Sequence, residues 1–135
     1  RARLAVASDE EKKEFIEKTG VNALAIMVGN AHGLYKGAKQ LDFDRIAAIK
    51  KATGAFLVLH GGSGTPDESY RKAIRLGINK INVNTEMRVA FATALHKSLH
   101  PMNQLTPYEY IAPAIDAVRK IVERKIRIYG ARNKL

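Results

Sequence analysis

Residues 55–68 read AFLVLHGGSGTPDE and join a short apolar run to a glycine-rich turn and a helix start. The apolar run, residues 55–59, is typical of a strand buried on both faces of a parallel sheet. Residues 65–68 combine a capping threonine, a proline suited to the first helical position and a glutamate three residues after the cap, which marks a helix start. The segment therefore predicts a strand, a turn and a helix in succession, and Gly77 is expected to end that helix.

Similar units are predicted on both sides of this segment. A second apolar run, residues 23–28, and a third segment, residues 78–83, are predicted strands, and each precedes a polar or glycine-rich loop and a helix. Strands that alternate with helices pair in parallel through right-handed crossovers, which favours either a (β/α)8 barrel or an open doubly wound sheet. The other predicted helices cover 9–18 (opened by a Ser8–Glu11 capping box), 42–53, about 85–99 (capped by Asn84 or Thr85) and 114–129, with Pro113 dividing the last from a short helical turn after Thr106.

The length limits this architecture. A closed (β/α)8 barrel has eight strands in about 250 residues, whereas this chain has 135 residues and three predicted strands. As a barrel, the chain must be a fragment or one part of a split protein. We therefore treat residues 1–135 as a single-domain fragment of α/β class.

Composition narrows the class of function. The sequence is 46% hydrophobic and 27% charged, contains no cysteine and has no apolar run near the roughly 20 residues that span a bilayer, so we expect a cytoplasmic protein without a membrane partner. The net charge of +10 is suited to nucleic acid or to phosphorylated small molecules. No aromatic residues interleave with the basic ones as base-stacking platforms, so nucleic acid is not the expected partner; a basic nucleic-acid-binding domain remains an alternative that only the charge supports.

Polar side chains follow the predicted strands. His32, His60 and Asn82 each stand at the carboxyl end of a strand. Because neighbouring parallel strands lie roughly 5 Å apart, both imidazoles can reach one cation, and neutral imidazole suits Zn²⁺. A catalytic zinc site has three protein ligands and an open position, and two are evident here. A second pair, His96 and His100, lacks the glutamate of a zinc-protease motif and is expected at a solvated helix end.

Two further segments suggest ligand binding. Gly61-Gly62-Ser63-Gly64 precedes a capped helix, where free backbone N–H groups and the helix dipole favour an anion, although such a loop can also be a simple connector. The segment 82–85, Asn-Val-Asn-Thr, either binds substrate hydroxyl groups or caps the following helix, and both readings stay open. Lys36 adds a cation to the first loop, or only a soluble surface charge.

These residues carry a family resemblance. The segments 29–37, 57–64 and 80–86 closely resemble class II fructose-bisphosphate aldolases, and the sister tagatose-bisphosphate enzymes share most of them. The resemblance extends from the first helix to residues 126–130. It implies the C-terminal part of a TIM (β/α)8 barrel, with about three parallel strands, their helices and a terminal helix.

The resemblance also implies roles for individual positions. His32 and His60 match two of the three zinc-ligand histidines, and a monovalent cation, Na⁺ or K⁺, is implied near the phosphate loops. Family members are usually homodimers or homotetramers. The positions that match those holding dihydroxyacetone phosphate are Gly33, Gly61, Gly62, Ser63, Asn82, Val83, Asn84 and Thr85, with Lys36 assisting from the first loop.

The departures from the family pattern matter as well. The family's catalytic aspartate and its adjacent zinc histidine lie in the N-terminal half, and nothing in this sequence matches them. The glutamate-bearing mobile loop that follows the fifth strand of the family is likewise absent. The general acid and base are therefore expected from that half, which becomes an implied partner, and this chain alone is expected to be inactive. Many fructose enzymes carry aspartate where this chain has Asn84, which leaves the sugar open.

The resemblance implies an activity of glycolysis and gluconeogenesis. The reaction is the reversible aldol cleavage of fructose 1,6-bisphosphate to dihydroxyacetone phosphate and glyceraldehyde 3-phosphate, with zinc as a Lewis acid. Two alternatives remain. One is cleavage of tagatose 1,6-bisphosphate, and the other is a phosphate-binding relic that no longer catalyses a reaction.

Overall fold

The computed structural model describes residues 8–30, 40–100 and 106–133, which fall into two compact units, Arg1–Asn82 and Val83–Leu135. His32, Gly33 and Lys36 lie outside the described residues. The single-domain organisation expected for residues 1–135 stays a prediction.

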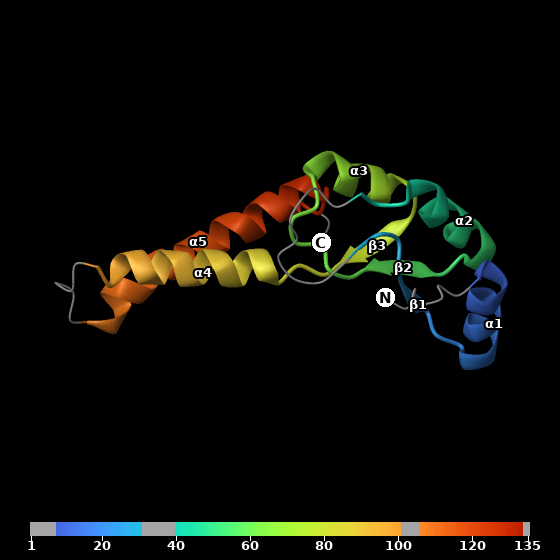
Figure 1. Cartoon of the computed structure of the whole chain (residues 1–135), viewed down its shortest axis with the longest axis horizontal. Helices are drawn as coiled ribbons and strands as arrows, with labels where there is room; N and C mark the ends of the chain where they lie inside the picture. Colours follow the sequence, from blue (N-terminus) through green and yellow to red (C-terminus); the bar gives the residue numbers. More distant parts are fainter. Residues whose placement is uncertain (1–7, 31–39, 101–105, 134–135) are drawn as a thin grey trace, which may run out of the picture. The chain divides into compact units, whose positions relative to one another are not determined.

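The first unit is a three-stranded parallel sheet with helices (Figure 1). The strands lie side by side in chain order, β1-β2-β3, and α2 and α3 lie on the same side of the sheet in Figure 1. This confirms the parallel strand–helix alternation that the sequence predicts. The elements are α1 (Asp9–Thr19), β1 (Ala23–Ile26), α2 (Phe43–Thr53), β2 (Phe56–Leu59), α3 (Asp67–Arg75) and β3 (Ile78–Ile81).

The core of this unit lies between the sheet and its helices. Ile46 and Ile49, one turn apart on α2, are fully buried and form the apolar face of that helix. They pack in one cluster with strand residues that include Leu57 and Leu59, also fully buried. Leu57 and Leu59 alternate with Val58 along β2, so both side chains lie on the face of the sheet that meets this core.

The pairing of β2 with β3 contains a one-residue offset. Leu57 pairs with Ile78, but Val58 pairs with Lys80 and Leu59 with Ile81. At the offset the side-chain oxygen of Asn79 accepts a hydrogen bond of 3.1 Å from the backbone N–H of Leu57. The ladder therefore skips one residue of β3 without leaving this backbone donor unpaired.

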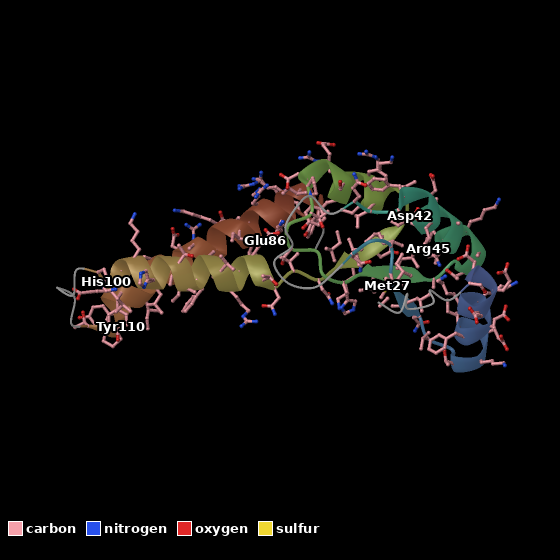
Figure 2. All side chains as sticks on the ribbon, viewed as in Figure 1. Met27, Asp42, Arg45, Glu86, His100 and Tyr110 are labelled. Atoms are coloured by element: carbon pink, nitrogen blue, oxygen red, sulfur yellow. The ribbon has the colours of Figure 1, made fainter. Side chains whose placement is uncertain are left out.

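The second unit consists of two helices packed against each other, α4 (Thr85–Ser98) and α5 (Pro107–Ile128). Lys125 near the end of α5 is buried, and its Nζ lies 2.9 Å from Oε2 of Glu86 at the start of α4, so the helices run antiparallel. Figure 2 labels Glu86 at that end of α4. Among the described residues, no helix combines the length and apolarity needed to cross a bilayer.

Two local predictions are wrong. Pro113 does not divide two helices but lies inside the continuous α5. Its missing N–H removes only the bond to the carbonyl of Glu109, in the first turn, and the bonds around it hold the helix together. Thr65 does not cap α3, because Pro66 occupies the N-cap position and no side-chain capping bond forms. The Ser8–Glu11 capping box of α1 is present as predicted.

We predict that Gly29→Ala destabilises the protein far more than Gly20→Ala. Both glycines have positive φ, 84° and 68°, but a Cβ at Gly29 meets the carbonyl oxygen of Gln40 at 2.3 Å, whereas none of the described atoms lies within 4 Å of a Cβ at Gly20. Left-handed strain alone costs about 1–2 kcal/mol, and the backbone clash raises the cost for Gly29→Ala to about 3 kcal/mol or more. Urea unfolding of both variants measures the difference, and equal midpoints would contradict the close packing of Gly29 against Gln40.

Candidate functional site

His60 and Asn82 lie next to each other at the carboxyl edge of the sheet. Each directly follows its strand, and the backbone N–H of Asn82 donates to the carbonyl of Leu59 at 2.9 Å. The side-chain nitrogen of Asn82 lies 3.3 Å from Nδ1 and 3.4 Å from Nε2 of His60. An amide nitrogen in the ring plane at equal distances from both nitrogens would collide with the carbon between them. The Asn82 amide therefore lies toward the face of the imidazole.

A residue that the sequence analysis assigned no role, Asn30, holds the other side of His60. Its side-chain nitrogen donates to the backbone carbonyl of His60 at 2.9 Å and to that of Ile26 at 3.3 Å. Its side-chain oxygen accepts from the N–H of Val28 at 2.7 Å. One amide thus fixes the turn after β1 and ties it to the end of β2. The signal that singled out Asn82, an asparagine just after a strand, applies equally to Asn30.

The glycine-rich loop after His60 is a closed turn. The N–H of Thr65 donates to the carbonyl of Gly62 at 3.1 Å, and Gly64 has φ of 79° at the third position of this turn. A positive φ at that position is typical of a type II turn and requires glycine in most cases. The N–H of Gly62 is itself bonded to the carbonyl of Asn82 at 3.0 Å. The loop is therefore attached to the end of β3, which argues against a simple connector.

The loop also contacts the helix that follows it. The hydroxyl of Tyr70, a fully buried residue of α3, donates to the carbonyl of Gly62. Tyr70 is a second residue without a role in the sequence analysis. A tyrosine on the inner face of a predicted helix reads as an ordinary core residue, and only the contact with Gly62 shows that its hydroxyl reaches the loop.

Two hydroxyl side chains are buried at this loop. Ser63 is 6% exposed and Thr65 is 5% exposed. The Oγ1 atom of Thr65 has no hydrogen-bond partner among the described residues. A buried hydroxyl without a partner costs about 1–3 kcal/mol, so this atom marks a place where a polar ligand or an ordered water is expected.

Asn84 and Thr85 belong to the second unit, at the start of α4. Asn84 occupies the N-cap position, but its side chain makes no capping hydrogen bond. Simple helix capping, one of the two readings left open for this segment, is therefore not what Asn84 does. Asn84 is exposed, and the backbone N–H groups of the first turn of α4 that follows it favour a polar ligand.

One of the two predicted zinc-ligand histidines lies among the described residues. His60 is described, whereas His32 is not, so the convergence of the two imidazoles stays a prediction. Within residues 8–30, 40–100 and 106–133, no three side chains of His, Asp or Glu gather as a metal site. His96 and His100 have ring centroids 4.9 Å apart and are exposed at the end of α4, as expected for a solvated helix end.

Resolved pKa changes among the described groups lie on α5. Hydrogen bonds from Lys120 and then Arg119 lower the pKa of Asp116, and the pKa of Arg119 is raised chiefly by its hydrogen bond to Asp116. The same guanidinium also contacts Glu123. These exposed side chains form a solvated ion-pair network one turn apart and indicate no chemistry.

Comparison with known proteins agrees with this arrangement. The family model described as "Fructose-bisphosphate aldolase class-II" matches residues 2–134. The structure of the YdjI aldolase from Escherichia coli K12 superimposes with a TM-score of 0.82 at 31% identity, over 95% of this chain and 46% of that chain. Fructose-bisphosphate aldolase from Campylobacter jejuni gives a TM-score of 0.77 at 20% identity, over 96% of this chain and 47% of that chain, and supports the fold alone.

The comparisons also identify the fold. The chain spans less than half the length of these two structures, and its three parallel strands match part of their architecture. The predicted α/β fold, part of a TIM (β/α)8 barrel, is thereby confirmed, and the open doubly wound sheet is set aside.

We predict that Asn30→Asp destabilises the protein by about 1–3 kcal/mol. The variant keeps the oxygen that accepts from Val28 but loses the N–H groups that satisfy the carbonyls of His60 and Ile26. Asn22→Asp, at an exposed residue before β1, is the matched control and is expected to change stability little. Urea unfolding at neutral pH measures both, and an equal effect of the two variants would remove the structural role given to Asn30.

Proposed function

Because the chain belongs to the class II fructose-bisphosphate aldolase family, we propose that it supplies the phosphate loop and part of the metal site of an aldolase. The proposed reaction is the reversible cleavage of fructose 1,6-bisphosphate to dihydroxyacetone phosphate and glyceraldehyde 3-phosphate. The observation that carries the proposal is the placement of His60, Asn82 and the glycine-rich loop at one carboxyl edge of the sheet. Active sites of (β/α)8 barrels lie at that edge.

The loop suits a phosphate. It leads into α3, whose N-terminus carries acidic residues but no side-chain capping bond to its backbone N–H groups. The buried Ser63 and the unpaired hydroxyl of Thr65 lie in the same turn. We assign direct phosphate contact to Gly61 and Ser63, as the family resemblance implies, and a shaping role to Gly62, whose N–H is bonded to the carbonyl of Asn82.

His60 suits zinc in its chemistry. Its imidazole stands at the carboxyl end of β2, and the Asn82 amide over its face limits the orientations of the ring. With His32 it would supply two nitrogen ligands of the kind zinc prefers. Zn²⁺, when bound, supplies a Lewis acid that draws electron density from the ketone of the substrate.

In the proposed reaction, the residues of this chain bind the sugar bisphosphate and orient it. Cleavage breaks the C3–C4 bond, the electron pair stays on the C3 fragment, and the C4 hydroxyl loses its proton as the aldehyde forms. The loop 61–63 holds the phosphate, and the amides of Asn82 and Asn84 bind sugar oxygens, so that binding energy is used to align the breaking bond. The C3 fragment then takes up one proton and becomes dihydroxyacetone phosphate. We assign proton transfer to a carboxylate from the N-terminal half of the barrel, where the family resemblance places it.

The wider context follows from the same family. We propose a cytoplasmic enzyme of glycolysis and gluconeogenesis that works as a homodimer or homotetramer, with Lys36 near the phosphate and Na⁺ or K⁺ beside the phosphate loops. Tagatose 1,6-bisphosphate is the second candidate substrate because Asn84 stands where many fructose enzymes carry aspartate. Comparing the rates of cleavage of the two sugars distinguishes them.

We predict that His60→Ala loses most of the zinc that the wild-type protein holds after dialysis. His96→Ala is the control, because it removes an exposed imidazole from a solvated helix end, and it is expected to keep its zinc. Elemental analysis of the purified proteins measures the metal content. Equal zinc in both variants would mean that His60 is no ligand, and the proposed metal site would be withdrawn.

We predict opposite effects of Thr65→Val on stability and on binding. Valine fills the same space without the unpaired hydroxyl, so the free energy of unfolding in phosphate-free buffer rises by about 1 kcal/mol. Affinity for inorganic phosphate falls, because a hydroxyl suited to a ligand is lost. Thr53→Val is the control and is expected to lower stability, since the Thr53 hydroxyl donates to Ile49 at 2.8 Å. Unchanged phosphate affinity in Thr65→Val would exclude this hydroxyl from the site.

A further inference from the structure

The hydroxyl of Tyr70 is an unusual group for its position. The side chain is fully buried, and the other buried residue of α3 is Ala73. A phenylalanine would fill the same space without a polar atom to satisfy. The hydroxyl instead donates to the carbonyl of Gly62, eight residues earlier in the chain. A buried hydroxyl aimed at a loop backbone is a means of fixing that loop.

Gly62 also bonds to the carboxyl edge of the sheet. Its N–H donates to the carbonyl of Asn82 at 3.0 Å, and the N–H of Asn82 donates to the carbonyl of Leu59 at 2.9 Å. Three hydrogen bonds in series therefore connect Tyr70 on α3 with the end of β2. The series passes through the Cα atoms of Gly62 and Asn82, so it fixes the positions of these two residues between α3 and β2.

We propose that Tyr70 is a positioning residue for phosphate binding, which it supports through Gly62 without touching the substrate. The inference rests on the proposed phosphate loop. A glycine-rich segment has many accessible conformations, and ordering it on binding reduces affinity. Tyr70 orders the loop beforehand, so that Gly61 and Ser63 keep the arrangement that binds the anion while Asn82 stays over His60.

The test compares Tyr70→Phe with Tyr108→Phe in the intact protein. Tyr108 is 73% exposed, so its variant makes the same chemical change away from the loop. Inorganic phosphate is titrated by calorimetry, and amide hydrogen exchange of Gly62 is followed by NMR. We expect Tyr70→Phe to weaken phosphate binding by about threefold to tenfold and to speed exchange of the Gly62 N–H, with Tyr108→Phe unchanged in both. A role confined to core packing would lower the melting temperature and leave phosphate affinity as it was.

Each outcome has a distinct meaning. Phosphate binding by Tyr70→Phe equal to wild type overturns this inference and leaves the proposed function standing. A wild-type protein that does not bind phosphate overturns the proposed function, and the role of Tyr70 falls with it. If Tyr70→Phe does not fold, hydrogen exchange in the wild-type protein decides. A Gly62 amide that exchanges as fast as an unprotected peptide would show that the loop is not held, and the inference would be overturned.

Discussion

The offset between β2 and β3 determines which side chain stands beside His60. Leu59 pairs with Ile81, so the residue that follows across from His60 is Asn82. Had the pairing continued without a shift from Leu57 and Ile78, Ile81 would occupy that place and an apolar side chain would face the imidazole. The oxygen of Asn79 makes the shift tolerable by accepting the Leu57 N–H. A single side-chain hydrogen bond within the strand pair thus sets the chemistry at its end.

The carboxyl edge is held mainly by backbone groups. Peptide N–H and carbonyl groups of Leu59, Gly62 and Asn82 bond one another, and side chains enter at the ends of this network, from Asn30 on one side and Tyr70 on the other. Backbone groups therefore carry much of the structural task at this edge. The backbone hydrogen bonds thus hold in place the few side chains that can bind a ligand.

The sequence predicted the elements of this fold better than their contacts. Apolar runs and glycine-rich loops identified the three strands and their parallel order, because these signals are local. The roles of Asn79 and Tyr70 were missed because their partners lie 22 and 8 residues away, and no local pattern reports such contacts. Asn30 had a local signal, an asparagine just after a strand, but its contact with His60, 30 residues away, had none. Pro113 and Thr65 misled for the opposite reason, since local preferences for breaking or capping a helix yielded to the surrounding structure. The placement of His32 stays a prediction, since it depends on a loop outside the described residues.

The ion pair of Lys125 and Glu86 restricts which substitutions the second unit can accept during evolution. Lys125 is buried, and its ammonium group meets the Glu86 carboxylate at 2.9 Å. Loss of Glu86 removes this carboxylate from beside a buried ammonium group, which destabilises the folded unit. A substitution at only one of the two positions is therefore disfavoured. In related chains we expect both positions to change together, either to two apolar residues or to a pair with the charges exchanged. The start of α4, next to Asn84, inherits this restriction because Glu86 lies in its first turn.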